Sequence, residues 1–264
     1  MRHSSVKEFV DGLQAEGRYC FTKKEVIKSL KLTPASLKFG LFRLCKKGRL
    51  RLIRRGFYVI VPLEYRSSGI LPPLLFIHEL MNFIGKPYYV GLLSAASLYG
   101  AAHQQPQELQ VITKSPERTV LVERARIHFF MKSQIENTTL TQVKGDTGYI
   151  HVSTPEDTAF DLVRYSRQLG GLNQIATVLM ELSEKLTPDS ILHGAKREKE
   201  LACSQRLGYI LEKIGKKALT YKLKKWVISQ KPSPILLDPN KELKKSSKYL
   251  DWNIIVNEKI ESEV

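Results

Sequence analysis

The sequence predicts an α+β protein with a small basic N-terminal domain over residues 1–66 and a mixed α/β domain over residues 67–264, whose C-terminal part is helical. A length of 264 residues fits two domains of ordinary size. The N-terminal segment holds 16 Lys/Arg and 5 Asp/Glu, a net charge of +11, whereas the remainder carries only +5. Because positive charge concentrated in this way attracts a polyanion, the N-terminal domain is the first candidate for binding nucleic acid.

Three short helices are predicted in this basic segment. Apolar residues recur at helical spacing over residues 5–16. After a short extended piece, Thr22 and Glu25 form a capping box that begins a helix over residues 23–30. Thr33, followed by a proline in the first turn, begins a third helix over residues 34–47. Two short helices separated by two residues have the spacing of a helix-turn-helix.

The third predicted helix has two distinct faces. Three leucines line one face, whereas Phe39, Arg43 and Lys46 point the opposite way with Ser36 beside them. A helix with cations and small polar groups on its outer face suits the major groove of DNA. The alternative is an amphipathic helix whose polar face is only solvated.

A hairpin follows this helix and completes the pattern. Strands are predicted at residues 49–53 and 57–61, with Arg54, Arg55 and Gly56 at the tip. This order predicts a winged helix-turn-helix, in which such a tip lies along phosphates or in the minor groove; an ordinary hairpin with solvated arginines is the alternative. The residues predicted to contact DNA are Ser36, Lys38, Phe39, Arg43, Lys46, Lys47, Arg49, Arg51, Arg54 and Arg55.

The second domain is predicted to begin after a proline-containing boundary at residues 67–75. Its first part, about residues 86–153, is expected to form a small mixed sheet, and about residues 155–230 are expected to be mostly helical. Strands are predicted at 88–91, 109–113, 119–122, 127–131, 149–152 and 254–256. Helices are predicted at 74–84, 93–102, 172–182, 191–202, 207–214 and 218–228, with a further helix beginning at Pro155.

Two features of the helical part allow more than one interpretation. Asp157 and Asp161 lie one turn apart, which suits either a metal site or, as we favour, a cap and an ion pair with Arg164. Residues 213–231 contain seven lysines and no acid, which indicates either a second anion-binding surface or a solvated helix face. The lysines considered for this surface are Lys213, Lys216, Lys217, Lys222, Lys224 and Lys225.

The sequence contains no specific catalytic motif. The phosphate-binding, dinucleotide-binding and serine-hydrolase glycine motifs are absent, and the histidines lack ligand spacing. The three cysteines, Cys20, Cys45 and Cys203, form no CxxC pair, which favours neither a zinc site nor a disulfide framework. We therefore expect a non-enzymatic protein without metal or cofactor. With no signal-like N-terminus and no sufficiently long apolar stretch, we also expect a cytoplasmic protein that does not enter a membrane.

Four segments carry a resemblance to a known family. They are residues 44–50 (LCKKGRL), 54–59 (RRGFYV), 89–103 (YVGLLSAASLYGAAH) and 109–113 (LQVIT). In a chain of this length they resemble the AbiEi antitoxins of bacterial type IV toxin–antitoxin systems, over about residues 20–165. The third segment is the specific one, because many regulators share a winged helix.

The resemblance implies a division of labour. The N-terminal domain would bind inverted repeats of double-stranded DNA upstream of its own operon and repress it. The C-terminal domain would neutralise a nucleotidyltransferase-like toxin without forming a stable complex with it. The alternatives are a ligand-responsive winged-helix transcription regulator and a nucleic-acid-processing enzyme that the winged helix docks on its substrate.

Overall fold

The computed structural model describes residues 4–101, 106–243 and 247–261, and it divides the chain into two compact units. The first unit comprises residues 1–89, 107–133 and 142–151, and the second comprises residues 90–106, 134–141 and 152–264. The predicted domain boundary after residue 66 lies within the first unit and remains a prediction. Ala102 and His103, the end of the most specific segment of the resemblance, lie outside the described residues.

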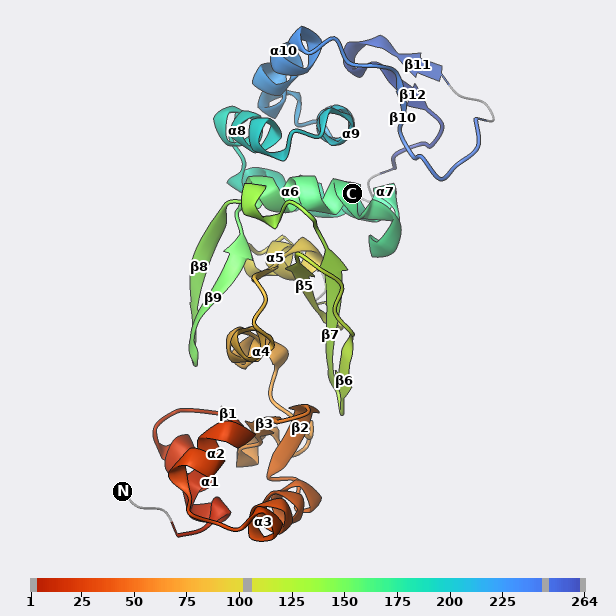
Figure 1. The fold of residues 1–264 in the computed structure, drawn as a ribbon. Helices are drawn as coiled ribbons and strands as arrows, with labels where there is room; N and C mark the ends of the chain where they lie inside the picture. The colour runs from red at the N-terminus through yellow and green to blue at the C-terminus, as the bar shows by residue number, and fades with distance from the viewer. Residues whose placement is uncertain (1–3, 102–105, 244–246, 262–264) are drawn as a thin grey trace. The chain divides into compact units, whose positions relative to one another are not determined.

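The N-terminal part of the first unit contains three helices and a three-stranded antiparallel sheet, coloured red to orange in Figure 1. Each predicted helix is confirmed to within one residue at its ends, and the predicted hairpin is present. The sheet order is β1-β3-β2, so the extended segment before the second helix becomes an edge strand. The elements are α1 (Val6–Ala15), β1 (Cys20–Thr22), α2 (Lys23–Ser29), α3 (Pro34–Lys46), β2 (Leu50–Arg54) and β3 (Phe57–Ile60).

Side-chain caps define where these helices begin. The Glu25 backbone N–H donates to the Thr22 hydroxyl at 3.2 Å, and the Thr22 N–H donates to the Glu25 carboxylate at 2.6 Å. The Thr33 hydroxyl accepts from the backbone N–H of Ser36 at 3.2 Å, which fixes the start of α3. Each such cap stabilises its helix by about 1 kcal/mol.

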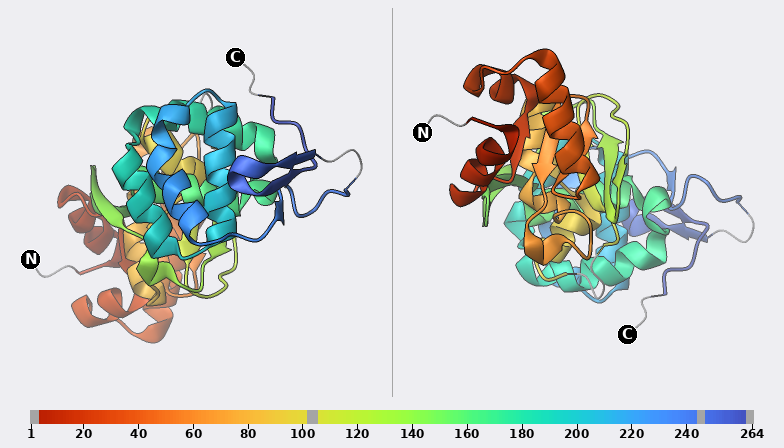
Figure 2. Two further views of the ribbon diagram at one scale, coloured as in Figure 1. Left: turned by 90° about the horizontal axis from the view of Figure 1, so that it is seen from above. Right: turned by 90° about the horizontal axis from the view of Figure 1, so that it is seen from below.

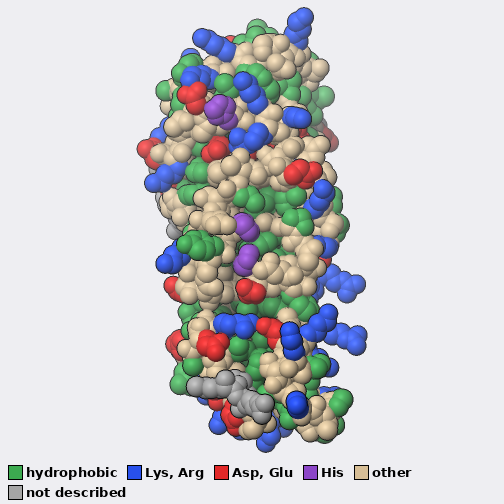
Figure 3. Space-filling view, turned by 60° about the vertical axis from the view of Figure 1, so that its left-hand side comes forward, with side chains coloured by type: hydrophobic (Ala, Val, Ile, Leu, Met, Phe, Trp, Pro, Cys, Tyr) green, Lys and Arg blue, Asp and Glu red, His purple; other side chains and the backbone are tan. Residues whose placement is uncertain are grey.

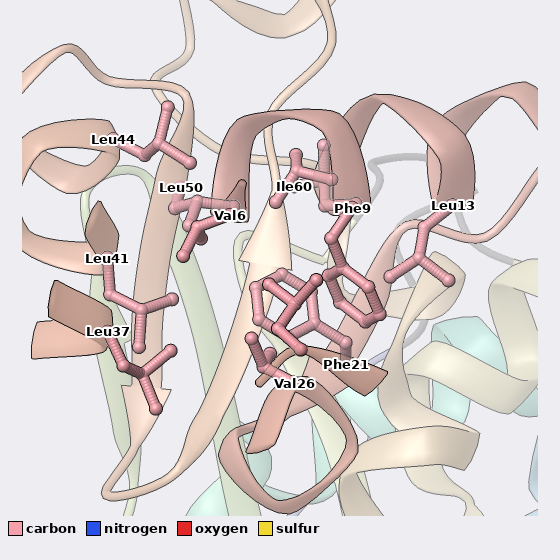
Figure 4. Close-up of a cluster of buried hydrophobic side chains, with 12 residues drawn as sticks. Val6, Phe9, Leu13, Phe21, Val26, Leu37, Leu41, Leu44, Leu50 and Ile60 are labelled. Carbon is pink, nitrogen blue, oxygen red and sulfur yellow. The ribbon is translucent and has the colours of Figure 1, made fainter. Parts of the chain in front are cut away.

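One apolar cluster holds this part together (Figure 4). Phe9 and Phe21 meet edge to face, with ring centroids 5.6 Å apart. Helices α1 and α3 approach closely at Gly40, where an added Cβ would lie 2.7 Å from a Val6 methyl carbon. The cluster consists of Val6, Phe9, Val10, Leu13, Phe21, Val26, Leu30, Leu37, Leu41, Leu44, Leu50 and Ile60.

The predicted mixed sheet is confirmed and has the strand order β6-β7-β5-β4-β9-β8. Strands β5 and β7 are parallel, as are β4 and β9, whereas β6 runs antiparallel to β7. The sequence did not predict β8, an edge strand with mostly exposed side chains and no alternating apolar pattern. The strands are β4 (Tyr88–Val90), β5 (Leu109–Thr113), β6 (Val120–Val122), β7 (Ala125–Met131), β8 (Leu140–Gly145) and β9 (Gly148–Ser153); α4 (Ile77–Ile84) precedes them.

Helices make up most of the second unit, as predicted, but several of the predicted boundaries are wrong. The helix expected at 93–102 ends at Leu98, and the helices expected from 191 and 218 begin at Pro188 and Tyr221. Lys199 adopts a left-handed conformation (φ 56°) just after one helix ends at Glu198, four residues before its predicted end at 202. The helix expected from residue 207 therefore begins at Leu201. The helices are α5 (Leu92–Leu98), α6 (Pro155–Arg164), α7 (Leu172–Leu182), α8 (Pro188–Glu198), α9 (Leu201–Lys213) and α10 (Tyr221–Ser229).

A small second sheet occupies residues 235–256, where the sequence predicted only the strand at 254–256. Its order is β10-β12-β11, from β10 (Ile235–Leu236), β11 (Ser247–Tyr249) and β12 (Ile254–Val256), seen in dark blue beside the helices in Figure 2. Trp252 is fully buried against Gly208 of α9, where an added Cβ would lie 2.1 Å from the indole ring. The Gln205 amide donates to the Trp252 carbonyl at 2.8 Å. These contacts fix the sheet to α9.

Candidate nucleic-acid interface

The outward face of α3 combines exposed aromatic and basic side chains. Leu37, Leu41 and Leu44 are buried in the core cluster, as their spacing predicts. On the opposite side, Phe39 is 71% exposed and Phe42 is 63% exposed. The basic residues of this helix, Lys38, Arg43 and Lys46, are also exposed, and so is Lys47 at its end.

The basic side chains around this face have no acidic partner in the described chain. No ion pair within 4.0 Å involves the basic residues of the α3 face, which are Lys38, Arg43, Lys46 and Lys47. The same holds for the four lysines on α2 and the turn after it: Lys23, Lys24, Lys28 and Lys31. The acid in this region, Glu25, pairs instead with Arg18 at 2.7 Å. The α2–α3 surface therefore presents uncompensated positive charge, the property that attracts phosphate.

The arginines of the predicted hairpin behave differently, because most of them pair within the protein. Arg49 lies 2.9 Å from Asp11, and Arg51 lies 2.9 Å from Glu123. Arg54 lies 3.4 Å from Glu117 and also donates to the carbonyl of Arg118. Contact of these three arginines with DNA stays a prediction, and within the protein their side chains are already held by acids.

The hairpin tip itself also packs against α4, within the first unit. The rings of Phe57 and Phe83 lie 5.3 Å apart, and Gly56 lies beside the Phe83 ring. Arg55 is exposed and forms no ion pair with a described residue, so it remains available to an anion. Ser36 is exposed, but its hydroxyl accepts a hydrogen bond from Thr33 at 2.9 Å as part of the helix cap.

An apolar groove lies beside the outward face of α3. It has a volume of about 510 Å³ and is lined by Phe39 and Phe42 from α3 and by Leu52 and Tyr58 from the hairpin strands, with Lys23 and Lys38 among its polar neighbours. Burial raises the pKa of the Tyr58 hydroxyl and of the Cys45 thiol above their ordinary values.

Sequence reasoning missed Phe42, Leu52 and Tyr58 as parts of this surface. At 100° per residue, Phe42 lies about 140° around the helix from Leu37. This spacing could have identified Phe42 as an outward-facing residue. The contributions of Leu52 and Tyr58 depend on how the hairpin packs beside α3, which no local pattern predicts.

Three of the seven lysines in the lysine-rich stretch of the second unit form ion pairs. Lys216 lies 2.6 Å from Glu184, and Lys222 pairs with Asp189. Lys224 pairs with Asp251 and lies 3.4 Å from Glu212. In the C-terminal part of the view in Figure 3, red acidic side chains lie among the blue basic ones.

These ion pairs also affect the titration of the acids. Hydrogen bonds from the lysines lower the pKa of Glu184, Asp189 and Asp251 below their ordinary values. Lys213 lies over the rings of Tyr209 and Tyr249, 5.4 and 5.1 Å from their centroids. Among the six lysines considered for a second surface, Lys217 and Lys225 are exposed and form no ion pair with a described residue.

The two aspartates of α6 form structural ion pairs. Asp157 is fully buried and accepts from the Thr139 N–H at 2.9 Å and from Arg197 at 2.7 Å. Asp161 is also fully buried, and its carboxylate lies 3.9 Å from the Arg164 guanidinium, as the favoured interpretation predicted. Across the described ranges, no group of three His, Cys, Asp or Glu side chains is arranged to hold a metal ion.

Residues 89–213 match the family model of the AbiEi antitoxin C-terminal domain. This part of the chain is therefore similar to the AbiEi domain. The match begins in β4 and ends with α9, and it confirms the family resemblance seen in the sequence. The N-terminal helices and hairpin lie outside the matched range. The AbiEi domain supports the assignment of the chain as an antitoxin of a type IV toxin–antitoxin system.

One solved structure is similar in fold over nearly the whole chain. The RV2827C protein from Mycobacterium tuberculosis is similar over 97% of this chain and 92% of its own, with a TM-score of 0.66 and 13% identity. An antigenic nucleotidyltransferase-like protein from Paracoccidioides brasiliensis gives a TM-score of 0.37 at 8% identity, over 57% of this chain and 89% of its own. No curated protein matches the sequence. Among the helices that the structure describes, none has the length and apolar character needed to cross a membrane.

Proposed function

We propose that the N-terminal part, about residues 1–66, is a winged helix-turn-helix that binds double-stranded DNA through the outward face of α3. The order of three helices and a hairpin supports this proposal, because it suits insertion of the third helix into the major groove. The observation that carries the proposal is the set of basic side chains on α2 and α3 that have no acidic partner. Arg55 is the hairpin residue that would reach the phosphates.

The family resemblance and the size of the expected interface indicate which kind of DNA sequence the protein binds. We propose that the protein represses its own operon by binding inverted repeats in the promoter. A single small DNA-binding module buries only about 600–1,000 Å² of protein surface, so one copy would bind weakly. Two copies on an inverted repeat, with half-sites spaced to suit the helical turn, would bind tightly.

The AbiEi domain is proposed to carry the antitoxin activity. Its functional partner would be a nucleotidyltransferase-like toxin, countered without a stable complex, and the protein would act in the cytoplasm without catalysing a reaction. Lys217 and Lys225 are the remaining candidates for a basic surface that takes part in this activity. The paired lysines of the same stretch, Lys213, Lys216, Lys222 and Lys224, are better explained by packing and ion pairing.

Three measurements on the full-length protein test the proposal. Fluorescence anisotropy with a labelled fragment of the native promoter should give tight, salt-dependent binding, and a promoter–reporter fusion should be repressed. Co-expression with the product of the adjacent operon gene should restore growth. Binding no tighter than to scrambled DNA, with an unrepressed reporter, would contradict autorepression; loss of rescue alone would contradict the antitoxin role.

A further inference from the structure

Two large apolar side chains on the outward face of α3 need a binding partner of their own. A single exposed apolar side chain is ordinary on a protein surface. Here, however, Phe39 and Phe42 are 71% and 63% exposed and line one groove together with Leu52, which is 48% exposed. Neither ring belongs to the core cluster of this part of the chain.

The surroundings of the two rings restrict the chemistry of the partner. Lys38, Arg43 and Lys46 are exposed on the same helix without acidic partners. The partner must therefore combine negative charge at the edges with an apolar group at the centre. The major groove of DNA offers this combination, since phosphates line its edges and the 5-methyl group of thymine is the apolar group on its floor.

We infer that Phe39 and Phe42 contact thymine methyl groups, so that the preferred half-site carries thymine where α3 enters the groove. This inference rests on the proposed function, in which α3 lies in the major groove. Side chains three positions apart on a helix have Cβ atoms about 5–6 Å apart. Base pairs are stacked about 3.4 Å apart, so the two rings can reach methyl groups on neighbouring or next-neighbouring base pairs.

The test uses duplexes that differ only in the methyl group. Anisotropy at fixed salt would compare alternating dA-dT and dA-dU duplexes, with the full-length protein and with Phe39→Ala and Phe42→Ala variants. The native protein should bind the thymine duplex about fourfold more tightly for each methyl group contacted, as burial of one carbon predicts. Each variant should lose its share of this preference and keep the salt dependence, because its cations are unchanged.

The outcomes separate this inference from the proposed function. Failure to bind any duplex would contradict DNA binding itself. Equal affinity for both duplexes, or an unchanged preference in the alanine variants, would overturn only the thymine contact. A conservative Phe39→Leu variant should retain part of the preference. Sedimentation of the DNA-free protein provides a further check, because self-association lost in Phe42→Ala would assign the rings to a second copy of this chain and overturn the inference.

Discussion

The α2–α3 surface and the C-terminal lysine stretch look alike in sequence but differ in the folded protein. Each is rich in basic residues. Around α3, Lys38, Arg43 and Lys46 meet no acidic side chain in the described structure. In the second unit, acids from other segments neutralise Lys216 and Lys222. A run of like charges therefore predicts an anion-binding surface only when distant segments do not supply its counter-charges.

The largest expected effect is the loss of DNA binding when α3 is charge-reversed. Replacing Lys38, Arg43 and Lys46 together with glutamate should weaken promoter binding on the order of thousandfold, because charged hydrogen bonds contribute about 1.5–3 kcal/mol each. All three side chains are exposed, so circular dichroism should be unchanged. Native affinity in this variant would contradict the prediction that the α2–α3 surface binds DNA.

A similarly large effect, on stability instead of binding, is expected in the second unit. Asp157→Ala leaves the Arg197 guanidinium and the Thr139 N–H without their carboxylate. Removing one partner of a buried ion pair lowers the free energy of unfolding by about 3–5 kcal/mol. Because Arg197 is partly exposed, we expect the lower end of this range, about 3 kcal/mol. Urea denaturation would measure the change. A loss below about 1 kcal/mol would show that this pair does not hold α6 to α8.

Two neighbouring arginines of the hairpin, one paired and one unpaired, allow the same comparison between single residues. Arg55 is unpaired, so Arg55→Ala should lower the slope of log K against log salt by about 0.9, the value for one phosphate contact. Arg54 is held by Glu117 and the Arg118 carbonyl, so Arg54→Ala should leave the slope unchanged. The reverse ranking would mean that Arg54 leaves its intramolecular partners when DNA binds.

The smallest effects are expected among the C-terminal lysines. Lys216→Ala and Lys222→Ala remove exposed ion pairs and should change neither promoter affinity nor the melting temperature measurably. Lys217→Glu with Lys225→Glu should weaken toxin rescue in co-expression if these two free cations contribute to it. Undiminished rescue by that variant, when folded, would identify the whole stretch as a solvated and paired helix face.

The sequence predicted those elements whose signals are local. Thr22 with Glu25, and Thr33 with the proline after it, gave the starts of α2 and α3 because helix caps are determined within four residues. Strand β8 was missed because an exposed edge strand needs no apolar alternation. The break at Lys199 was missed because a left-handed lysine has no strong sequence signature.

The candidate site was predicted in part for the same reason. Helical spacing identified Phe39, Arg43 and Lys46 as outward-facing. It did not reveal that Glu117 and Glu123, more than 60 residues later, pair with Arg54 and Arg51. Nor did it reveal that Leu52 and Phe42 line one groove. These contacts depend on how distant segments pack, which a local sequence pattern does not predict.

The salt dependence of promoter binding tests the central claim most directly. The slope of log K against log salt would be measured for the native protein, for a Lys38/Arg43/Lys46→Ala variant and for a Lys216/Lys217/Lys224/Lys225→Ala variant. We predict that the α3 variant lowers the slope by about 2–3 units, at about 0.9 per phosphate lost, and that the C-terminal variant leaves it unchanged. An unchanged slope in the α3 variant together with a lowered slope in the C-terminal variant would place DNA on the second unit and contradict the account.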